Sequence, residues 1–420
     1  MWGLLAGLYL FVSLYRLSTG VLAEDLARAF GATATALGSL HAAFFYVYAP
    51  LQLVAGVLAD RYGPRVTASV GAVAMHGGAL LFAASPVFAA AFAGRLLMGL
   101  GASVIFIATL RFCANWYRAD EFATVSGLTI AVSGLGGIVA TYPLALAVTA
   151  VGWRVAVAAL ALVGLAIAAG AYLGVRNEPD DPAVFGAPEA HGTTSMADVI
   201  DNLRRVLGSL QTWNIGAIYF VATGVNITVF GLWGVPYLVQ IHGLSVPDAA
   251  AITLLGSLGL ATGPPAVGRL SDRLESRVPL MVVAGVVFVA SYAAIAVTGD
   301  PPLAVVALAF FGAGFLIGGY ALGLTVMKES HRAAASGTAT GAVNTAGFLG
   351  AAVFPTAMGA LLDAEWTGET VAGSRVYTLA GYRAGFGVAT AAGLFALAMT
   401  LVLYWRRRNG HGSDASRPPQ

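Results

Sequence analysis

Charged residues are scarce in this sequence. Asp, Glu, Lys and Arg make up 10% of its 420 residues, whereas soluble globular chains contain about a quarter. Hydrophobic residues make up 58%, and the mean hydropathy is +0.80. Much of the surface must therefore face a medium other than water, which excludes an ordinary soluble protein. The net charge of only +2 gives nucleic-acid binding no electrostatic support.

Cysteine and clustered histidine are scarce as well. Cys113 is the single cysteine, which excludes an intramolecular disulfide and a multi-cysteine metal site. The 6 histidines are scattered singly, and the sequence has no visible nucleophile–base–acid arrangement. We therefore expect neither an enzyme nor a bound metal or other cofactor. No basic residue precedes the first apolar run, so a secretory signal peptide is not expected, and the missing polar tail before Trp2 suggests that the natural start lies upstream.

Apolar runs of roughly 20 residues recur along the whole chain, and each is long enough to cross a bilayer as a helix. The 53 glycines suit helices that pack closely in lipid. We predict an all-α membrane protein of about twelve transmembrane helices in two pseudo-symmetric six-helix bundles, at residues 1–175 and 213–405, with a linker at 176–212 and a tail at 406–420. The predicted spans are 2–29, 34–59, 65–84, 87–116, 122–150, 153–175, 213–240, 247–267, 278–298, 302–327, 334–361 and 380–405.

The distribution of Lys and Arg predicts the orientation. If the N-terminus is inside, sixteen basic residues lie in inner loops and the tail, and only Arg28, Arg154, Arg375 and Arg383 lie outside. Inner loops of membrane proteins carry the excess of Lys and Arg. We therefore expect both termini in the cytoplasm and a location in the cytoplasmic membrane.

The chain contains an internal repeat. The segment GVLADRYGPR at Gly56–Arg65 has a degenerate copy, VGRLSDRLESR, at Val267–Arg277, which places Asp60 and Asp272 212 positions apart. Two further pairs recur at offsets of 210 and 212 positions: Ser126-Gly127 with Ser336-Gly337, and Tyr142-Pro143 with Phe354-Pro355. Parallel repeats of this kind imply a pseudo-two-fold axis along the membrane normal, with the ligand site between the halves.

These motifs resemble those of the major facilitator superfamily. The match to its Gly-x-Leu-Ala-Asp-Arg-x-Gly-x-Arg signature is made by Gly56, Asp60, Arg61, Gly63 and Arg65, and a second match, in the fourth span, by Arg95, Gly99 and Gly101. The resemblance covers essentially the whole chain. It implies a secondary active transporter that works by rocking its two halves, as a monomer in lipid, with a small-molecule substrate and either a coupling or an exchanged ion.

The fifth span departs from one branch of that superfamily. Drug–proton antiporters carry Gly-Pro-x-x-Gly-Gly there, whereas this chain reads SGLGGIVATYP, with proline only at Pro143. The flanking segments are more similar to bacterial permeases for nitrate or nitrite, sugar phosphates or amino acids. A proton-coupled exporter of drugs or metabolites remains an alternative, as does a membrane sensor or channel that does not transport.

The resemblance implies a conformational latch at the inner loop. This loop is expected to face the start of the eleventh span, at 333–338, where a carboxylate gains about 0.3–1 kcal/mol from a helix N-terminus. We expect Asp60 to close the cytoplasmic side there, with Asp272 in a weaker mirrored role. The residues expected to share the charge of Asp60 are Arg61, Arg65, Arg111 and Arg118. The alternative is that these charges only fix topology and loop structure.

Two arginines fall inside the predicted spans. Arg16 lies some fourteen residues into the first span, near the midplane, and Arg95 some eight residues into the fourth. All 20 acidic residues fall in loops, tails or helix ends, so none neutralises either arginine at that depth. Because a buried unpaired cation is costly, we expect Arg16 to bind an anionic substrate. The alternative is a structural arginine bonded to helix carbonyls, which we favour for Arg95.

The same lack of acids leaves histidine as the titratable candidate for ion coupling. His41 is the preferred proton relay and His76 a less favoured one, while uniport, exchange and the direction of transport stay open. Buried polar and aromatic side chains on the cavity-lining helices are the remaining substrate-binding candidates, because they need partners in hydrocarbon. They are Tyr46, Asn226, Trp233, Tyr320 and Asn344.

Overall fold

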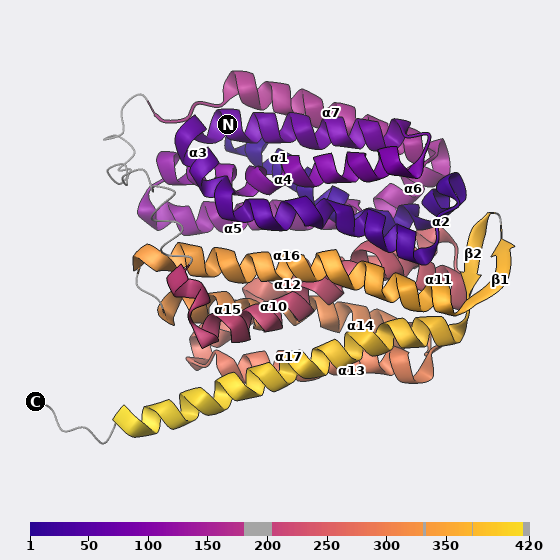
Figure 1. Ribbon diagram of the computed structural model, residues 1–420. Helices are drawn as coiled ribbons and strands as arrows, with labels where there is room; N and C mark the ends of the chain where they lie inside the picture. Colours follow the sequence, from indigo (N-terminus) through magenta and orange to yellow (C-terminus); the bar gives the residue numbers. More distant parts are fainter. Residues whose placement is uncertain (180–203, 331–332, 372, 415–420) are drawn as a thin grey trace, which may run out of the picture.

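The computed structural model describes residues 1–179, 204–330, 333–371 and 373–414. Nearly all of it is helical, and the helices form two bundles that lie side by side with their long axes roughly aligned (Figure 1). Among the described residues, ten helices are long and apolar enough to cross a membrane, and a bent pair makes eleven. Helix α3 contains two of the predicted spans, separated by a break at Gly63. The predicted fold class is confirmed.

The N-terminal bundle contains the first seven helices. Their bounds are α1 (Trp2–Leu17), α2 (Thr19–Phe30), α3 (Ala34–Ala84), α4 (Phe88–Trp116), α5 (Ala119–Val139), α6 (Tyr142–Val151) and α7 (Trp153–Gly174). Helix α3 covers two predicted spans, because non-helical dihedrals at Gly63 (φ 76°, ψ 162°) turn the chain between them. The first predicted span is in fact two helices, α1 and α2, which meet at Ser18 with a bend of 53°.

The C-terminal bundle repeats this arrangement with more interruptions. Its bounds are α10 (Leu210–Thr228), η1 (Val229–Trp233), α11 (Gly234–His242), α12 (Val246–Leu274), α13 (Val278–Thr298), α14 (Leu303–Phe315), α15 (Ile317–Ser330), α16 (Ala333–Ala364) and α17 (Leu379–Asp414). The predicted linker falls largely on residues outside the description. Helix α10 begins three residues before the predicted start of its span, and η1 is one turn of π-helix within the α10–α11 span.

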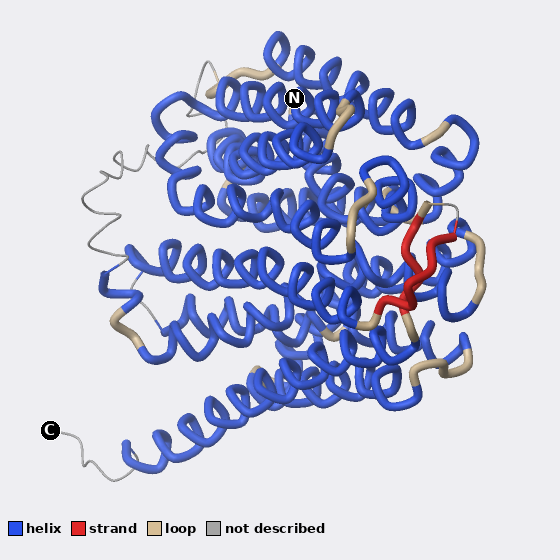
Figure 2. Tube along the Cα trace, turned by 45° about the vertical axis from the view of Figure 1, so that its right-hand side comes forward, coloured by secondary structure: helices blue, strands red, loops and turns tan. Residues whose placement is uncertain are grey.

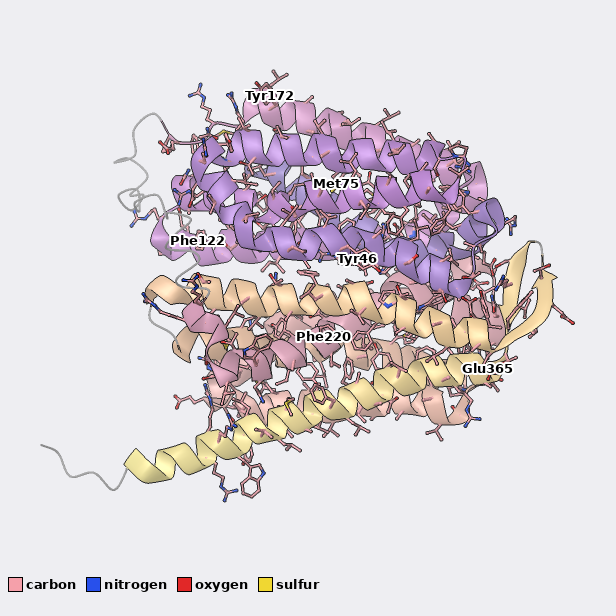
Figure 3. The ribbon with its side chains drawn as sticks, in the orientation of Figure 1. Tyr46, Met75, Phe122, Tyr172, Phe220 and Glu365 are labelled. Atoms are coloured by element: carbon pink, nitrogen blue, oxygen red, sulfur yellow. The ribbon has the colours of Figure 1, made fainter. Side chains whose placement is uncertain are left out.

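A short β-hairpin was not predicted. Strands β1 (Trp366–Val371) and β2 (Ser374–Tyr377) pair antiparallel between α16 and α17. Figures 1 and 2 show this hairpin at one end of the bundles, and Figure 1 shows the C-terminal ends of α7, which precedes the predicted linker, and of α17 at the other. We call these two ends the hairpin end and the linker end. In Figure 3, Tyr172 and Phe122 mark the linker end and Glu365 the hairpin end.

Candidate functional site

A cavity of about 670 Å³ lies between the two bundles. Helices α1 and α5 line it from the N-terminal bundle, and α10, α12, α15 and α16 from the C-terminal bundle. It reaches towards the linker end, where Thr124 of α5 and Arg269 of α12 lie in its wall. Its polar and charged lining residues are Tyr9, Ser13, Arg16, Thr124, Ser133, Thr223, Asn226, Ser257 and Arg269.

Arg16 projects into this cavity from α1. Its Nη2 donates a hydrogen bond of 3.0 Å to the Tyr48 hydroxyl. Its guanidinium lies over two rings, 5.0 Å from the centre of Tyr48 and 4.7 Å from that of Phe348. Its Nε is buried without a hydrogen-bond partner, and Arg16 forms no ion pair within the described part of the chain. The aromatic faces stabilise the cation but leave hydrogen-bonding capacity free for a ligand.

Three other polar residues in the cavity wall are already paired within the protein. Ser13 and Ser133 hydrogen-bond to each other across α1 and α5. The Asn226 amide donates to the Ala313 carbonyl at 3.2 Å and accepts from the Tyr292 hydroxyl at 2.5 Å. Asn226 therefore lies where the sequence placed it, but its amide is satisfied by the protein itself. Buried polar groups without such partners would be costly.

The other predicted substrate-binding residues do not line this cavity. Tyr46 lies on a different face of α3 and is 43% exposed (Figure 3). Trp233 is buried and donates from Nε1 to the Pro355 carbonyl at 3.2 Å. Tyr320 is buried beside Phe288, and Asn344 is half-buried on α16. Tyr48 and Phe348, which contact Arg16, take the place that sequence reasoning gave to Tyr46.

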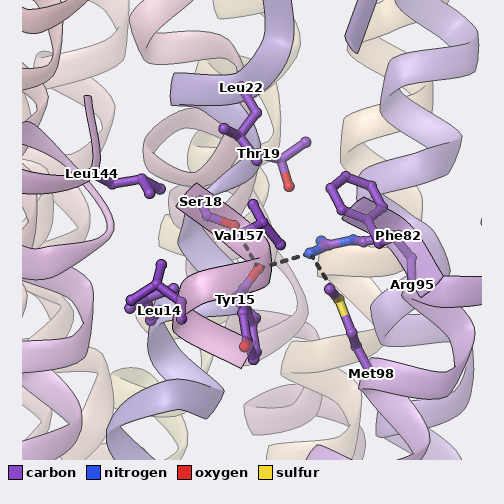
Figure 4. Close-up of a pocket in the computed structure, with 11 residues that line it drawn as sticks. Leu14, Tyr15, Ser18, Thr19, Leu22, Phe82, Arg95, Met98, Leu144 and Val157 are labelled. Atoms are coloured by element: carbon purple, nitrogen blue, oxygen red, sulfur yellow. Dashed lines mark hydrogen bonds between the residues drawn. The ribbon is translucent and has the colours of Figure 1, made fainter. Parts of the chain in front are cut away.

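Arg95 is buried within the N-terminal bundle (Figure 4). Its guanidinium donates to three carbonyl oxygens, those of Tyr15 at 2.8 Å, Leu40 at 3.3 Å and His41 at 3.3 Å. It therefore joins α4 to α1 and α3 through backbone acceptors, an arrangement that fits the structural role that we favoured. The other two residues of its motif allow close helix packing: a Cβ at Gly99 would collide with the Phe44 carbonyl and one at Gly101 with the Gly71 carbonyl.

The two candidate histidines differ in their surroundings. His41 is fully buried, its Nδ1 lies 3.0 Å from the Thr19 hydroxyl, and its Nε2 has no partner. A Cβ at Gly231, in the other bundle, would lie 2.8 Å from the His41 ring. His76 instead packs inside the N-terminal bundle, with its Nδ1 3.0 Å from the Tyr15 hydroxyl. Only His41 lies at the contact between the bundles.

The inner-loop motif forms a compact cluster at the linker end. Asp60 pairs with Arg111 at 3.3 Å. Arg65 lies over the Tyr172 ring and donates from its backbone N–H to the Asn177 side chain. The other predicted latch residues do not contact Asp60 in the interactions of the described residues. Gly56 has open space beside its Cα, and Arg61 lies over the Tyr62 ring. Arg118 pairs with Asp120, and Asp272 is exposed. The predicted partner of Asp60, the start of α16, lies outside the residues whose side chains are described.

The bundles touch closely at the hairpin end. A Cβ at Gly38 of α3 would collide with the Pro355 carbonyl of α16, and one at Gly359 with the Ala34 carbonyl. The Asp363 carboxylate of α16 accepts hydrogen bonds from the backbone N–H groups of Ala34 (2.9 Å) and Thr35 (2.8 Å), at the N-terminus of α3. We call these contacts the seal. A carboxylate at a helix N-terminus is stabilised by the unpaired N–H groups there.

The hairpin supports the seal. Arg375 and the Tyr377 hydroxyl both reach the Asp363 carboxylate, at 3.5 and 3.4 Å. The Gln240 side chain of α11 donates to the Arg375 carbonyl and accepts from the Tyr377 N–H, each at 3.1 Å. Burial raises the pKa of Tyr377 well above its ordinary value, so its hydroxyl stays protonated and able to donate. Sequence reasoning missed Asp363, because an acid at a helix end reads as ordinary solvent-facing charge.

A model of the Major Facilitator Superfamily matches residues 4–355. The chain belongs to this family. Its members are multi-pass membrane transporters. The resemblance that the sequence motifs indicated is confirmed.

The chain is similar to individual transporters and to one membrane sensor. The chain is 28% identical to the hexuronate transporter of Bacillus subtilis over 239 residues, which cover 55% of each chain. It is 26% identical to a "Probable sulfoacetate transporter" of Cupriavidus necator, over 66% of this chain and 65% of that protein. It is also 26% identical to the membrane sensor protein UhpC of Salmonella typhimurium, over 80% and 79% of the two chains. These first two alignments span only about half to two thirds of the relatives.

Among solved structures, a bacterial homologue of the human lysosomal transporter Spinster superposes with a TM-score of 0.75 at 15% identity. The superposition covers 96% of this chain and 95% of that one. At this identity the likeness establishes the fold alone.

Proposed function

We propose that the protein is a secondary active transporter that carries a small anion through the central cavity. The observation that carries this proposal is the Arg16 guanidinium, which projects into the cavity with a buried free Nε and no acidic partner among the described residues. A desolvated cation needs an anion or a set of acceptors, and a carboxylate matches a guanidinium geometrically. The hexuronate and sulfoacetate relatives carry anions by name, which supports the assignment.

The transport cycle that we propose is alternating access by rocking of the bundles. The seal closes the cavity at the hairpin end, while the cavity wall continues to Thr124 and Arg269 towards the linker end. In the opposite state the seal opens, and Asp60 closes the linker end against the start of α16. Each latch then places one carboxylate on the N-terminus of a helix in the other bundle.

We further propose that the linker end faces the cytoplasm and that the protein lies in the cytoplasmic membrane. The linker end holds most of the Lys and Arg of the loops, as cytoplasmic ends do. In this orientation the state described here opens inwards. His41 is the candidate coupling group, because its free Nε2 faces Gly231 and would meet water when the seal opens.

Uptake of a panel of radiolabelled small anions into proteoliposomes tests the function, with apolar monocarboxylates, hexuronate and sulfoacetate among them. We expect saturable uptake of at least one of these anions by the unaltered protein. Arg16→Ala should raise the apparent Kd for the anion by roughly tenfold to a hundredfold, since a hydrogen bond to a charged group contributes about 1.5–3 kcal/mol. Arg273→Ala is the matched control, because Arg273 is exposed on α12 and lies outside the cavity. Equal affinity in the Arg16→Ala and Arg273→Ala proteins would refute the anion site.

A membrane sensor is the second candidate, favoured by the relative UhpC, which is named as one. A sensor would bind the anion at Arg16 without moving it. Binding measured by thermal shift, together with uptake no faster than in protein-free vesicles, would assign this role instead.

A further inference from the structure

The lining of the central cavity restricts the polarity of the uncharged part of the anion as well as the number of its charges. We infer that the cavity accepts an anion with one charged group and an apolar aliphatic or aromatic body, rather than a polyhydroxylated sugar acid. This inference rests on the proposed function, since it assumes that the anion binds at Arg16. Three features of the described lining carry it.

First, the cavity offers a single desolvated cation. Arg16 is half-buried and lies against the rings of Tyr48 and Phe348. The only other charged residue in the described lining, Arg269, is exposed towards the linker end. A ligand with a carboxylate at each end would have to leave one of them either beside Arg269 in solvent or unpaired against apolar wall, which is costly. One buried charge on the ligand therefore fits best.

Second, the wall around Arg16 is mainly hydrocarbon. Its apolar members come from both bundles, so that a ligand body would meet them on opposite sides. The larger ones are Leu17, Ile130, Ile227, Leu260, Ile317 and Phe348. Contact with such groups removes apolar ligand surface from water and gains about threefold to fourfold in affinity for each methylene buried. The volume of about 670 Å³ is ample for a ring or a chain of several carbons.

Third, the protein itself occupies part of the polar lining. Ser13 and Ser133 bond to each other, and both ends of the Asn226 amide are taken by Ala313 and Tyr292. Of the buried side-chain atoms in the lining, the Ser257 hydroxyl and the Arg16 Nε are left without partners. The lining hydroxyls outside these pairs, those of Tyr9, Thr124, Thr223 and Ser257, come from four different helices. They cannot all reach a single ligand that carries a hydroxyl on nearly every carbon, and each ligand hydroxyl left unpaired loses its bonds to water.

Affinity measurements in lipid nanodiscs with matched six-carbon acids test the inference. Hexanoate and glucuronate have the same carbon count and carboxylate but opposite bodies, and hexanol has the apolar body without the charge. We expect hexanoate to bind at least tenfold more tightly than glucuronate, and its affinity to rise about threefold to fourfold per methylene from butanoate to octanoate. Hexanol should bind no better to the protein than to empty nanodiscs.

Variants separate the two levels of the proposal. Arg16→Ala should weaken the binding of every acid in the series by roughly tenfold to a hundredfold. Leu260→Ser and Ile317→Ser should each weaken the binding of hexanoate at least threefold and leave the binding of butanoate nearly unchanged. Two independent variants keep the test valid if one of them is unstable. Glucuronate binding that depends on Arg16 and equals or exceeds that of hexanoate would overturn the apolar-body inference while leaving the anion function intact. Binding of all acids regardless of Arg16 would overturn both.

Discussion

Glu275 follows Gly63 by 212 positions, the offset of the internal repeat, and both residues have positive φ at the same turn of the two bundles. Gly63 has φ 76° and ψ 162°, a region essentially reserved for glycine. Glu275 has φ 48° and ψ 31°, a left-handed helical conformation that a side chain tolerates at modest cost. The degenerate copy therefore keeps the turn but makes it with a different backbone conformation.

Gly63→Ala should lower the stability of the protein clearly. A Cβ at this position meets both unfavourable dihedrals and the Asn177 side chain, which bonds to the backbone of Arg65. Strain of this kind costs roughly 1–3 kcal/mol. Thermal unfolding in detergent should show a lower Tm. Glu275→Ala is the matched variant at the repeated position, and its Tm should stay close to that of the unaltered protein. Similar losses in both would contradict this account.

The repeat also shows what the sequence could reveal. Its spacing predicted two equivalent bundles, and the apolar runs predicted the crossings to within a few residues in most cases. The bend at Ser18 was not visible, because α1 and α2 form one continuous apolar run. The hairpin was not visible either, since its ten strand residues are too short and too exposed to show an alternating pattern.

Asp363→Asn should loosen the hairpin end. The amide keeps the shape but loses the charge that accepts from two backbone N–H groups, from Arg375 and from Tyr377. Hydrogen bonds to a charged group are worth about 1.5–3 kcal/mol, so the open population should rise roughly tenfold or more. The probe is a Leu232→Cys substitution in a Cys113→Ala background, because Leu232 is buried beside Gly20. The measurement is the rate at which a maleimide added on the hairpin side labels this cysteine.

An exposed acid provides the comparison. Glu369 lies on the outer face of β1 and is exposed, so Glu369→Gln should leave the labelling rate unchanged. An Asp363→Asn protein that labels no faster than the Glu369→Gln protein would show that the carboxylate does not hold the seal.

Gly38→Val should prevent the seal from forming. The added side chain occupies the space of the Pro355 carbonyl on α16, which is main chain and cannot rotate away. We expect transport to fall by at least tenfold, while anion binding at Arg16 is retained, because the cavity wall is not altered. Gly77→Val, at a helical glycine with nothing within 4 Å of its Cβ position, is the control and should transport normally. Loss of binding together with transport in the Gly38→Val protein would indicate misfolding instead.

Arg95→Met should reduce folding rather than recognition. Removal of the guanidinium leaves three carbonyl oxygens on α1 and α3 without their donor, at a cost of roughly 3 kcal/mol. We expect a lower Tm and a lower yield of folded protein, with the Kd for the anion unchanged in the folded fraction. Arg95→Lys keeps the charge but cannot reach three acceptors. Its Tm should therefore lie between those of the unaltered protein and the Arg95→Met protein. A changed Kd at unchanged Tm would assign Arg95 to the substrate instead.

Tyr46 illustrates why the site was harder to predict than the fold. Tyr46 and Tyr48 are two positions apart on α3, which separates them by more than half a turn of helix. Hydropathy reports depth in the membrane and not the direction in which a residue faces, so it could not show that Tyr46 faces away from the cavity. Only packing against Phe348, a contact between residues 300 positions apart, decides that Tyr48 meets Arg16.

The bend between α1 and α2 joins the proposed anion site to a contact between the bundles, that of α2 with η1. Arg16 lies two residues before Ser18, and Gly20 lies two residues after it, where a Cβ would lie 3.0 Å from the Leu232 carbonyl. Arg95 holds the elbow itself through the Tyr15 carbonyl. If an anion binds at Arg16 as proposed, its pull on the guanidinium acts on α2 across this bend. A segment of five residues, roughly 6 Å of helix, then connects ligand binding to the contact between the bundles at Gly20.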